Sequence, residues 1–179
     1  MRLRVFNPDM DFESIKGWIP DERSHAMWCA NRFQYPLDKD NFISVLSEMS
    51  QRTGDEPFVA VMDDDRTVGF LCYSLNRDIG EGKLKFVIVD PECQGKGIAQ
   101  EMLHLIISYA FEDVETKRVS LNVFAQNPRA KKAMKKPALP KENPTTVLDS
   151  YTKKNSGTDA VWQQNEVSEA NYTNSSLSG

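Results

Sequence analysis

The sequence predicts one α/β (α+β) domain in which helices flank a sheet, and three features support this prediction. Helical patterns fill residues 10–49, three short apolar runs separated by turns occupy residues 57–89, and an apolar helix pattern begins at residue 98. Strands joined by short turns form a meander, and helices gathered in one part of the chain are typical of this class. The 179 residues suffice for one such core.

The first third of the chain is predicted to be one short strand followed by helices. Residues 3–6 alternate apolar and charged side chains, and the segment Asn7-Pro8-Asp9 supplies cap and turn chemistry for a helix over residues 10–18. A second helical stretch spans residues 21–30. A third covers residues 38–49, where apolar side chains recur at helical spacing.

The middle of the chain is predicted to form three strands, over residues 57–62, 67–75 and 83–89. A polar turn joins the first two. Gly69, inside the second strand, indicates a bulge or a close approach of another element.

A helix over residues 98–112, a strand over residues 118–124 and a further helix beginning at Asn127-Pro128 complete the predicted order. Pro128 suits a first helical turn because that position needs no backbone N–H.

Composition excludes several classes of protein. The net charge of −4 and pI near 5.3 argue against a nucleic-acid partner, because nucleic-acid-binding domains carry a basic face. The three cysteines (Cys29, Cys72 and Cys93) are widely spaced, which predicts neither disulfides nor a metal site. No run is long enough to span a membrane and no secretory signal is evident, so we expect no membrane partner and a cytoplasmic location.

The stretch from Val87 to Ala99 carries the predicted chemistry. A β-branched run ends in a turn with Gly95 and Gly97, and a helix without a side-chain cap follows. Glycines let backbone amides approach a ligand, the first amides of a helix lack intrahelical partners, and Lys96 adds positive charge. The turn therefore predicts a phosphate site. Its spacing fits neither a P-loop nor a dinucleotide fingerprint.

Gln94-x-x-Gly97-x-Ala99 resembles the [QR]xxGx[GA] signature of the GCN5-related N-acetyltransferases (GNAT family), and Asn127-Pro128-Arg129-Ala130 resembles that family's NPxA motif. The resemblance covers residues 1–136. It implies a mixed, mostly antiparallel GNAT-like sheet flanked by helices, with the last two strands missing. The polar tail, residues 137–179, shows no sustained period and is expected to be poorly ordered.

The resemblance also implies the ligands and their contacts. The co-substrate would be acetyl-CoA, the acceptor a primary amine of a small molecule or a protein N-terminus, and no metal would take part. Val87, Ile88 and Val89 would lie along the pantetheine arm, and Asn127 would hydrogen-bond it. The pyrophosphate would be held by the turn and the helix start, that is by Gln94, Gly95, Lys96, Gly97, Ile98 and Ala99.

The catalytic residues are less evident. Relatives carry a general-acid tyrosine seven residues after the motif asparagine, where this chain has Met134, whose thioether cannot donate a proton. With suitable synonymous codons, a single-base shift near codon 133 restores the family's Tyr-Glu-Lys-x-Gly-Phe, so we hypothesise a frameshift from about Lys132 onward. Sequencing codons 130–141 tests this. Glu81 is a weak candidate for the general base, with a solvated turn residue as the alternative.

Other interpretations stay open. Trp18, Trp28, Phe33 and Tyr35 could hold a cationic amine or simply pack the helices, and packing is favoured. His104 lies within the apolar helix pattern and is interpreted as a packed or surface helix residue in preference to a catalyst. His25 lies in the segment that walls the acceptor pocket in relatives, so a role in substrate binding stays open for it.

Alternative functions are a catalytically impaired CoA-binding domain and a nucleotide-binding domain of another class. Missing strands would expose a sheet edge that a second copy could cover as a homodimer.

Overall fold

The computed structural model describes residues 1–112, 116, 118–124 and 167–173. Its elements, in chain order, are β1 (Arg2–Val5), α1 (Pro8–Gly17), α2 (Glu22–Cys29), α3 (Lys39–Thr53), β2 (Glu56–Val61), β3 (Thr67–Asn76), β4 (Glu81–Val89), the short 3-10 helix η1 (Pro91–Cys93), α4 (Ile98–Glu112), β5 (Arg118–Phe124) and β6 (Val167–Thr173).

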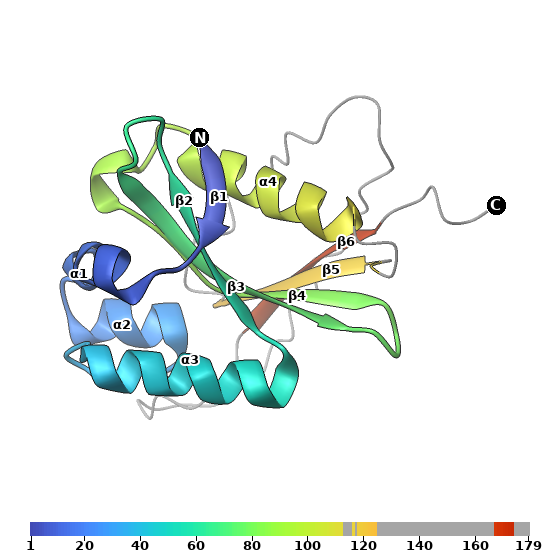
Figure 1. The fold of residues 1–179 in the computed structure, drawn as a ribbon, viewed down its shortest axis with the longest axis horizontal. Coiled ribbons are helices and arrows are strands. Elements are labelled where there is room, and N and C mark those ends of the chain that lie inside the picture. The colour runs from blue at the N-terminus through green and yellow to red at the C-terminus, as the bar shows by residue number, and fades with distance from the viewer. Residues whose placement is uncertain (113–115, 117, 125–166, 174–179) are drawn as a thin grey trace, which may run out of the picture.

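The six strands form one sheet in the order β1-β2-β3-β4-β5-β6. Every neighbouring pair is antiparallel except β4 and β5, which run parallel because α4 carries the chain across the sheet between them. Helices α1, α2 and α3 cover one face and α4 covers the other (Figure 1). The predicted fold class is therefore confirmed, including the meander of β2, β3 and β4.

Both faces of the sheet are buried in its centre, as the alternation along β2 shows. Phe58 and Ala60 pack toward α4, whereas Val59 and Val61 pack toward α1 to α3. Successive side chains of a strand point to opposite faces, so β2 contributes to two hydrophobic cores.

Each of the first three helices begins with a side-chain cap, and the one at Asn7 was predicted from the sequence. Asn7, Asp21 and Asp38 accept hydrogen bonds through their side chains from the amides of Asp9, Ser24 and Asn41, respectively. Such caps satisfy amides that have no intrahelical partner.

Both interpretations of Gly69 hold. The register of β2 and β3 shifts between Ala60 and Val61, opposite Gly69. A Cβ on Gly69 would also lie 2.5 Å from the Met102 sulfur, so the glycine lets α4 approach β3 closely.

The tail contributes one strand, although the resemblance implied that the last two strands are missing. Residues 167–173 form β6, which pairs antiparallel with β5 from Arg118↔Thr173 to Phe124↔Val167. Pairing with β6 gives hydrogen-bond partners to the backbone N–H and C=O groups along the outer edge of β5. Any added strand can supply these partners, whether or not its side chains follow a hydrophobic period. One strand therefore follows β5, and the edge expected to be exposed is paired. The helix predicted from Asn127 lies outside the described residues.

Candidate functional site

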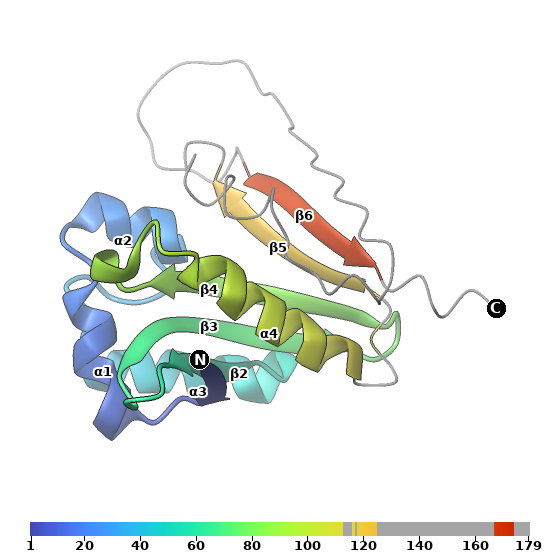
Figure 2. The ribbon, with the colours of Figure 1, turned by 90° about the horizontal axis from the view of Figure 1, so that it is seen from above.

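The parallel pair of β4 and β5 opens partway along its length. The two strands pair from Glu81↔Arg118 to Leu84↔Leu121, yet β4 continues to Val89. Figure 2 shows them diverging from that point toward the end of β4 that leads into α4. Among the described residues, no strand pairs with the β5-facing backbone edge of β4 beyond Leu84, and such an edge suits a ligand that pairs like an added strand.

A bulge in β4 lies at the start of this opening. Phe70 pairs with Ile88 and Cys72 pairs with Lys85, so two residues of β4, Phe86 and Val87, lie opposite one residue of β3. Phe86 adopts a φ of 53°, an uncommon conformation for a bulky side chain. The bulge sends Val87 and Val89 toward the α4 core, while Phe86 and Ile88 pack on the opposite face.

The bulge is tied to α2 by a hydrogen bond. The Trp28 indole Nε1–H donates to the Phe86 carbonyl oxygen at 2.8 Å. This bond could not be predicted, because nothing in the sequence gives Phe86 a positive φ, and Trp28 was interpreted only as a packing residue or a contact for a cationic amine.

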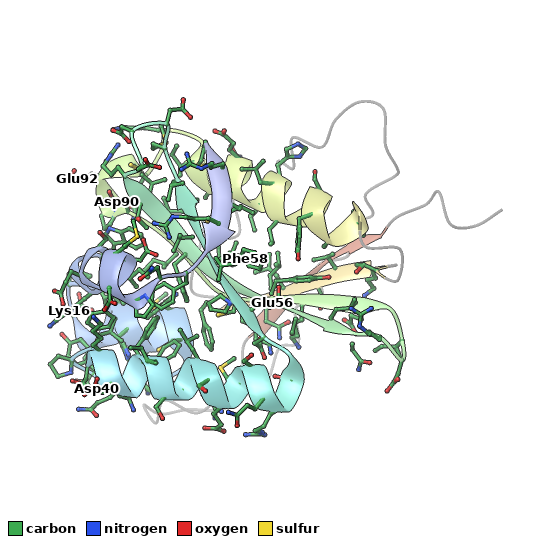
Figure 3. The ribbon with its side chains drawn as sticks, in the orientation of Figure 1. Lys16, Asp40, Glu56, Phe58, Asp90 and Glu92 are labelled. Carbon is green, nitrogen blue, oxygen red and sulfur yellow. The ribbon has the colours of Figure 1, made fainter. Side chains whose placement is uncertain are left out.

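The turn after β4 is built around Asp90. Its amide donates to the Val68 carbonyl at 2.9 Å, which fixes the turn to β3, and its side chain accepts from the Glu92 amide at 2.9 Å. Arg66 of the β2–β3 hairpin lies 3.7 Å from the same carboxylate. Figure 3 shows Asp90 and Glu92 together at this turn, next to the start of α4. Cys93 is buried at this turn.

Backbone amides gather where the turn enters α4. Gly95 and Gly97 have φ of 78° and 83°, which side chains other than glycine rarely adopt. A Cβ on Gly95 would meet no atom within 4 Å, so these glycines serve conformation and not packing. The amides of Gln100 and Glu101 both donate to the Gly97 carbonyl at 3.0 Å, which starts the helix.

The amides ahead of that first turn, those of Gly97, Ile98 and Ala99, belong to positions that lack intrahelical acceptors. Lys96 is exposed beside them. The result is a cradle suited to an anion, at the end of the opening between β4 and β5.

Glu81 lies at the opposite end of β4 from this turn. Its carboxylate accepts from the Ser120 hydroxyl at 2.9 Å and lies 3.5 Å from the Arg118 guanidinium.

A second charged pair, which sequence reasoning missed, lies next to the bulge. Lys85 Nζ lies 2.7 Å from Asp55 Oδ1, and Asp55 is almost fully buried at 1% exposure. Thr53 also donates to the Asp55 carboxylate. Burial, followed by the nearby charge of Asp55, raises the pKa of the Cys72 thiol well above its ordinary range.

The aromatic residues of the first third form one cluster. Trp28 stacks on Phe33 at 5.5 Å and on Phe42 at 6.4 Å between ring centroids. For Trp28 and Phe33, these contacts agree with the favoured interpretation, which is packing. His25 is buried with Nε2 3.4 Å from Cys29 Sγ, and burial lowers the pKa of its imidazole.

Two site residues from the sequence cannot be placed. Asn127 and Met134 lie outside the described residues. Within the part of the chain that is described, no group of three or more His, Cys, Asp or Glu side chains is arranged to hold a metal ion, and no helix has the length and apolar character needed to cross a membrane.

Comparison with known proteins agrees with this geometry. The structure superposes with a TM-score of 0.70 on spermidine N-acetyltransferase from Vibrio cholerae in complex with CoA and spermine, at 18% identity over 97% of this chain and 95% of that chain. It superposes with a TM-score of 0.68 on the ribosomal-protein-S5-alanine acetyltransferase from Vibrio fischeri, at 17% identity over 99% and 94% of the two chains. At these identities the likeness establishes the fold.

Sequence comparison establishes the family. The chain is 26% identical over 117 residues to an N-acetyltransferase 9-like protein from Caenorhabditis briggsae, a match that covers 65% of this chain and 49% of that protein. The chain thus spans about half the length of this curated relative. The model of the acetyltransferase (GNAT) family matches residues 19–138, which is more than half of the chain. The chain therefore belongs to the acetyltransferase (GNAT) family.

Proposed function

We propose that the protein is an N-acetyltransferase that transfers an acetyl group from acetyl-CoA to a primary amine. The observation that carries the proposal is one continuous surface, in which the opening between β4 and β5 leads directly to the amides at the start of α4. An extended amide-containing arm suits the first part, and a diphosphate suits the second.

The residues of the turn have defined roles in this proposal. The amides of Gly97, Ile98 and Ala99 would donate to the pyrophosphate, and the Lys96 ammonium would offset part of its charge. The edge of β4 from Val87 to Val89 would pair with the amides of the pantetheine arm. Among the relatives, the Vibrio cholerae spermidine N-acetyltransferase is described with CoA and spermine bound, which supports both a CoA ligand and an amine acceptor.

The transfer itself is simple in outline. The neutral amine nitrogen attacks the thioester carbonyl carbon, the new C–N bond replaces the C–S bond, and the proton lost by the amine ends on the departing CoA thiol. Backbone N–H groups of β4 would orient the carbonyl and stabilise the oxyanion that forms on it. The acceptor is a small amine or a protein N-terminus.

A second candidate is a CoA-binding domain with impaired catalysis. It is favoured by Met134, which stands where the family motif places a proton-donating tyrosine. Loss of a positioned general acid lowers the rate by about 10²- to 10⁴-fold without abolishing ligand binding.

One experiment separates the two candidates. Acetyl-CoA is added to the purified full chain, its effect on the melting temperature is recorded, and free thiol is then assayed with a panel of polyamines, aminoglycosides and peptides with free N-termini. Stabilisation together with thiol release supports the enzyme. Stabilisation without release supports the impaired domain, and stabilisation by ATP or NAD but not by CoA contradicts both.

A further inference from the structure

The shape of the proposed cofactor strand depends on a single strained residue. Leu84 and Val87 both pack toward α4, whereas a regular strand would place residues three apart on opposite faces. The extra residue is accommodated where Phe86 takes its φ of 53°. If Phe86 returned to an extended conformation, the strand beyond it would slip by one residue and exchange its two faces.

The Trp28 indole is fixed in the direction that supports this bulge. Its ring stacks on Phe33 and Phe42, which contact each other with ring centroids 4.5 Å apart, and meets the Phe86 ring edge-on at 6.2 Å. The indole N–H therefore points at the Phe86 carbonyl and donates to it at 2.8 Å. In an extended strand this carbonyl would bond to a neighbouring strand, so the indole replaces a partner that the bulge removes.

The residue before the bulge is fixed as well. The Lys85 ammonium lies 2.7 Å from the buried Asp55 carboxylate, at the start of β2. Two consecutive residues of β4 are thus held from outside the strand, one through its side chain and the other through its carbonyl.

We propose that Trp28 is a positioning residue for the cofactor strand. By holding the Phe86 carbonyl, it keeps the backbone of Val87 to Val89 turned toward the opening between β4 and β5. Because Trp28 belongs to α2, it also links the helical layer to the strand that would bind the arm of CoA. This inference rests on the proposed function, since it assigns the fixed strand to CoA.

The test compares Trp28→Phe with Trp18→Phe. Phenylalanine keeps an aromatic ring but has no N–H. Trp18 is a matched control because it is buried in the same aromatic and aliphatic cluster, and within the described residues its indole makes no hydrogen bond to β4. The dissociation constant for CoA is measured by calorimetry on the full chain, and hydrogen exchange is followed at the amides of residues 85–90 without ligand.

Trp28→Phe is expected to bind CoA about tenfold more weakly, because a hydrogen bond to a partly buried carbonyl is lost, and to exchange faster at residues 85–90. Trp18→Phe is expected to stay within twofold of the parent in affinity, with unchanged exchange there. Equal affinity and equal exchange in the two variants would overturn the inference. If the parent chain binds no CoA, the proposed function fails, whereas the exchange comparison still decides whether Trp28 holds the bulge.

A measurement on the parent chain covers the case in which Trp28→Phe does not fold. The indole N–H resonance of Trp28 is assigned by elimination with Trp18→Phe and Trp162→Phe. Slow solvent exchange and a shift on CoA addition are expected, whereas fast exchange with no shift would refute the role.

Discussion

The buried carboxylate of Asp11 offers the sharpest test of how the first helix is fixed to the sheet. Both Arg4 Nη1 and Nη2 donate to it at 2.7 Å, the Asn7 amide donates at 2.8 Å, and the Thr67 hydroxyl donates at 2.7 Å. Asp11 is 0% exposed. The buried carboxylate thus joins three elements: an ion pair with Arg4, whose side chain is 25% exposed, links α1 to β1, and the Thr67 hydrogen bond links α1 to β3.

The perturbation is Asp11→Asn. The asparagine side chain has the same shape as that of aspartate, but it has one acceptor oxygen in place of two. Its NH₂ group would face the Arg4, Asn7 and Thr67 groups, which donate hydrogen bonds to Asp11 in the parent. The change also removes the charge opposite Arg4. Breaking a buried pair on one side costs about 3 kcal/mol or more, which corresponds to a fall in Tm of roughly 6 to 12 °C for a chain of this size.

Thermal and urea denaturation of the parent and of Asp11→Asn measure this cost. Asp9→Asn is the matched control, because Asp9 lies in the same first turn, pairs with Lys39 at 2.8 Å, and has a side chain that is 85% exposed. An exposed pair contributes about 0 to 1 kcal/mol. A loss in Asp11→Asn no larger than in Asp9→Asn would refute the reasoning.

The same site predicts a pH dependence. Burial alone would raise the pKa of Asp11, but the Arg4 guanidinium, the Asn7 amide and the Thr67 hydroxyl outweigh it and lower the pKa. A carboxylate with a lowered pKa in the folded state contributes stability that is complete above the unfolded pKa, near 4, and is lost as pH falls through the folded value. The parent should therefore lose more stability below pH 4 than Asp11→Asn does.

Three further predictions follow from packing, charge and burial. Gly69→Ala should lower the stability by about 1 to 3 kcal/mol, because the new Cβ would lie 2.5 Å from the Met102 sulfur; a Tm equal to that of the parent would contradict the close approach. Lys96→Ala should weaken CoA binding severalfold and reduce its salt dependence, since an exposed ammonium is lost beside the anion; an unchanged salt dependence, measured by calorimetry at two ionic strengths, would contradict this role. Cys29 and Cys72 should not react with a thiol reagent at pH 8 until urea unfolds the chain, because burial raises the pKa of both thiols; rapid labelling of the folded chain would be inconsistent with their burial.

The sequence was sufficient to predict helices and strands whose positions are determined by the local pattern of side chains. The helix of residues 38–49 was predicted from apolar side chains at helical spacing, and α3 spans Lys39–Thr53. The strand of residues 67–75 was predicted from a short apolar run bounded by turns, and β3 spans Thr67–Asn76. The turn between β4 and α4 was also readable, because Gly95 and Gly97 with positive φ leave a direct mark on the sequence.

Contacts between residues far apart in the sequence could not be predicted in this way. The bulge at Phe86 depends on an indole 58 positions earlier in the chain, and no local pattern announces a phenylalanine with positive φ. The pair of Asp55 and Lys85 likewise joins residues that look like ordinary surface charges in the sequence. The strand β6 was missed because pairing along β5 rests on backbone groups, which every sequence supplies.

The central claim is that the amides at the start of α4 hold a diphosphate, and CoA affinity in a pair of glycine variants tests it most directly. Gly97→Glu places a carboxylate at the proposed anion site, where φ is 83°. Gly54→Glu introduces the same charge at a residue with φ of 64°, whose Cβ would meet no atom within 4 Å, at the end of α3. Calorimetry should show CoA binding to the parent and to Gly54→Glu with similar affinity, and at least tenfold weaker binding to Gly97→Glu. Equal binding by all three proteins would contradict the claim.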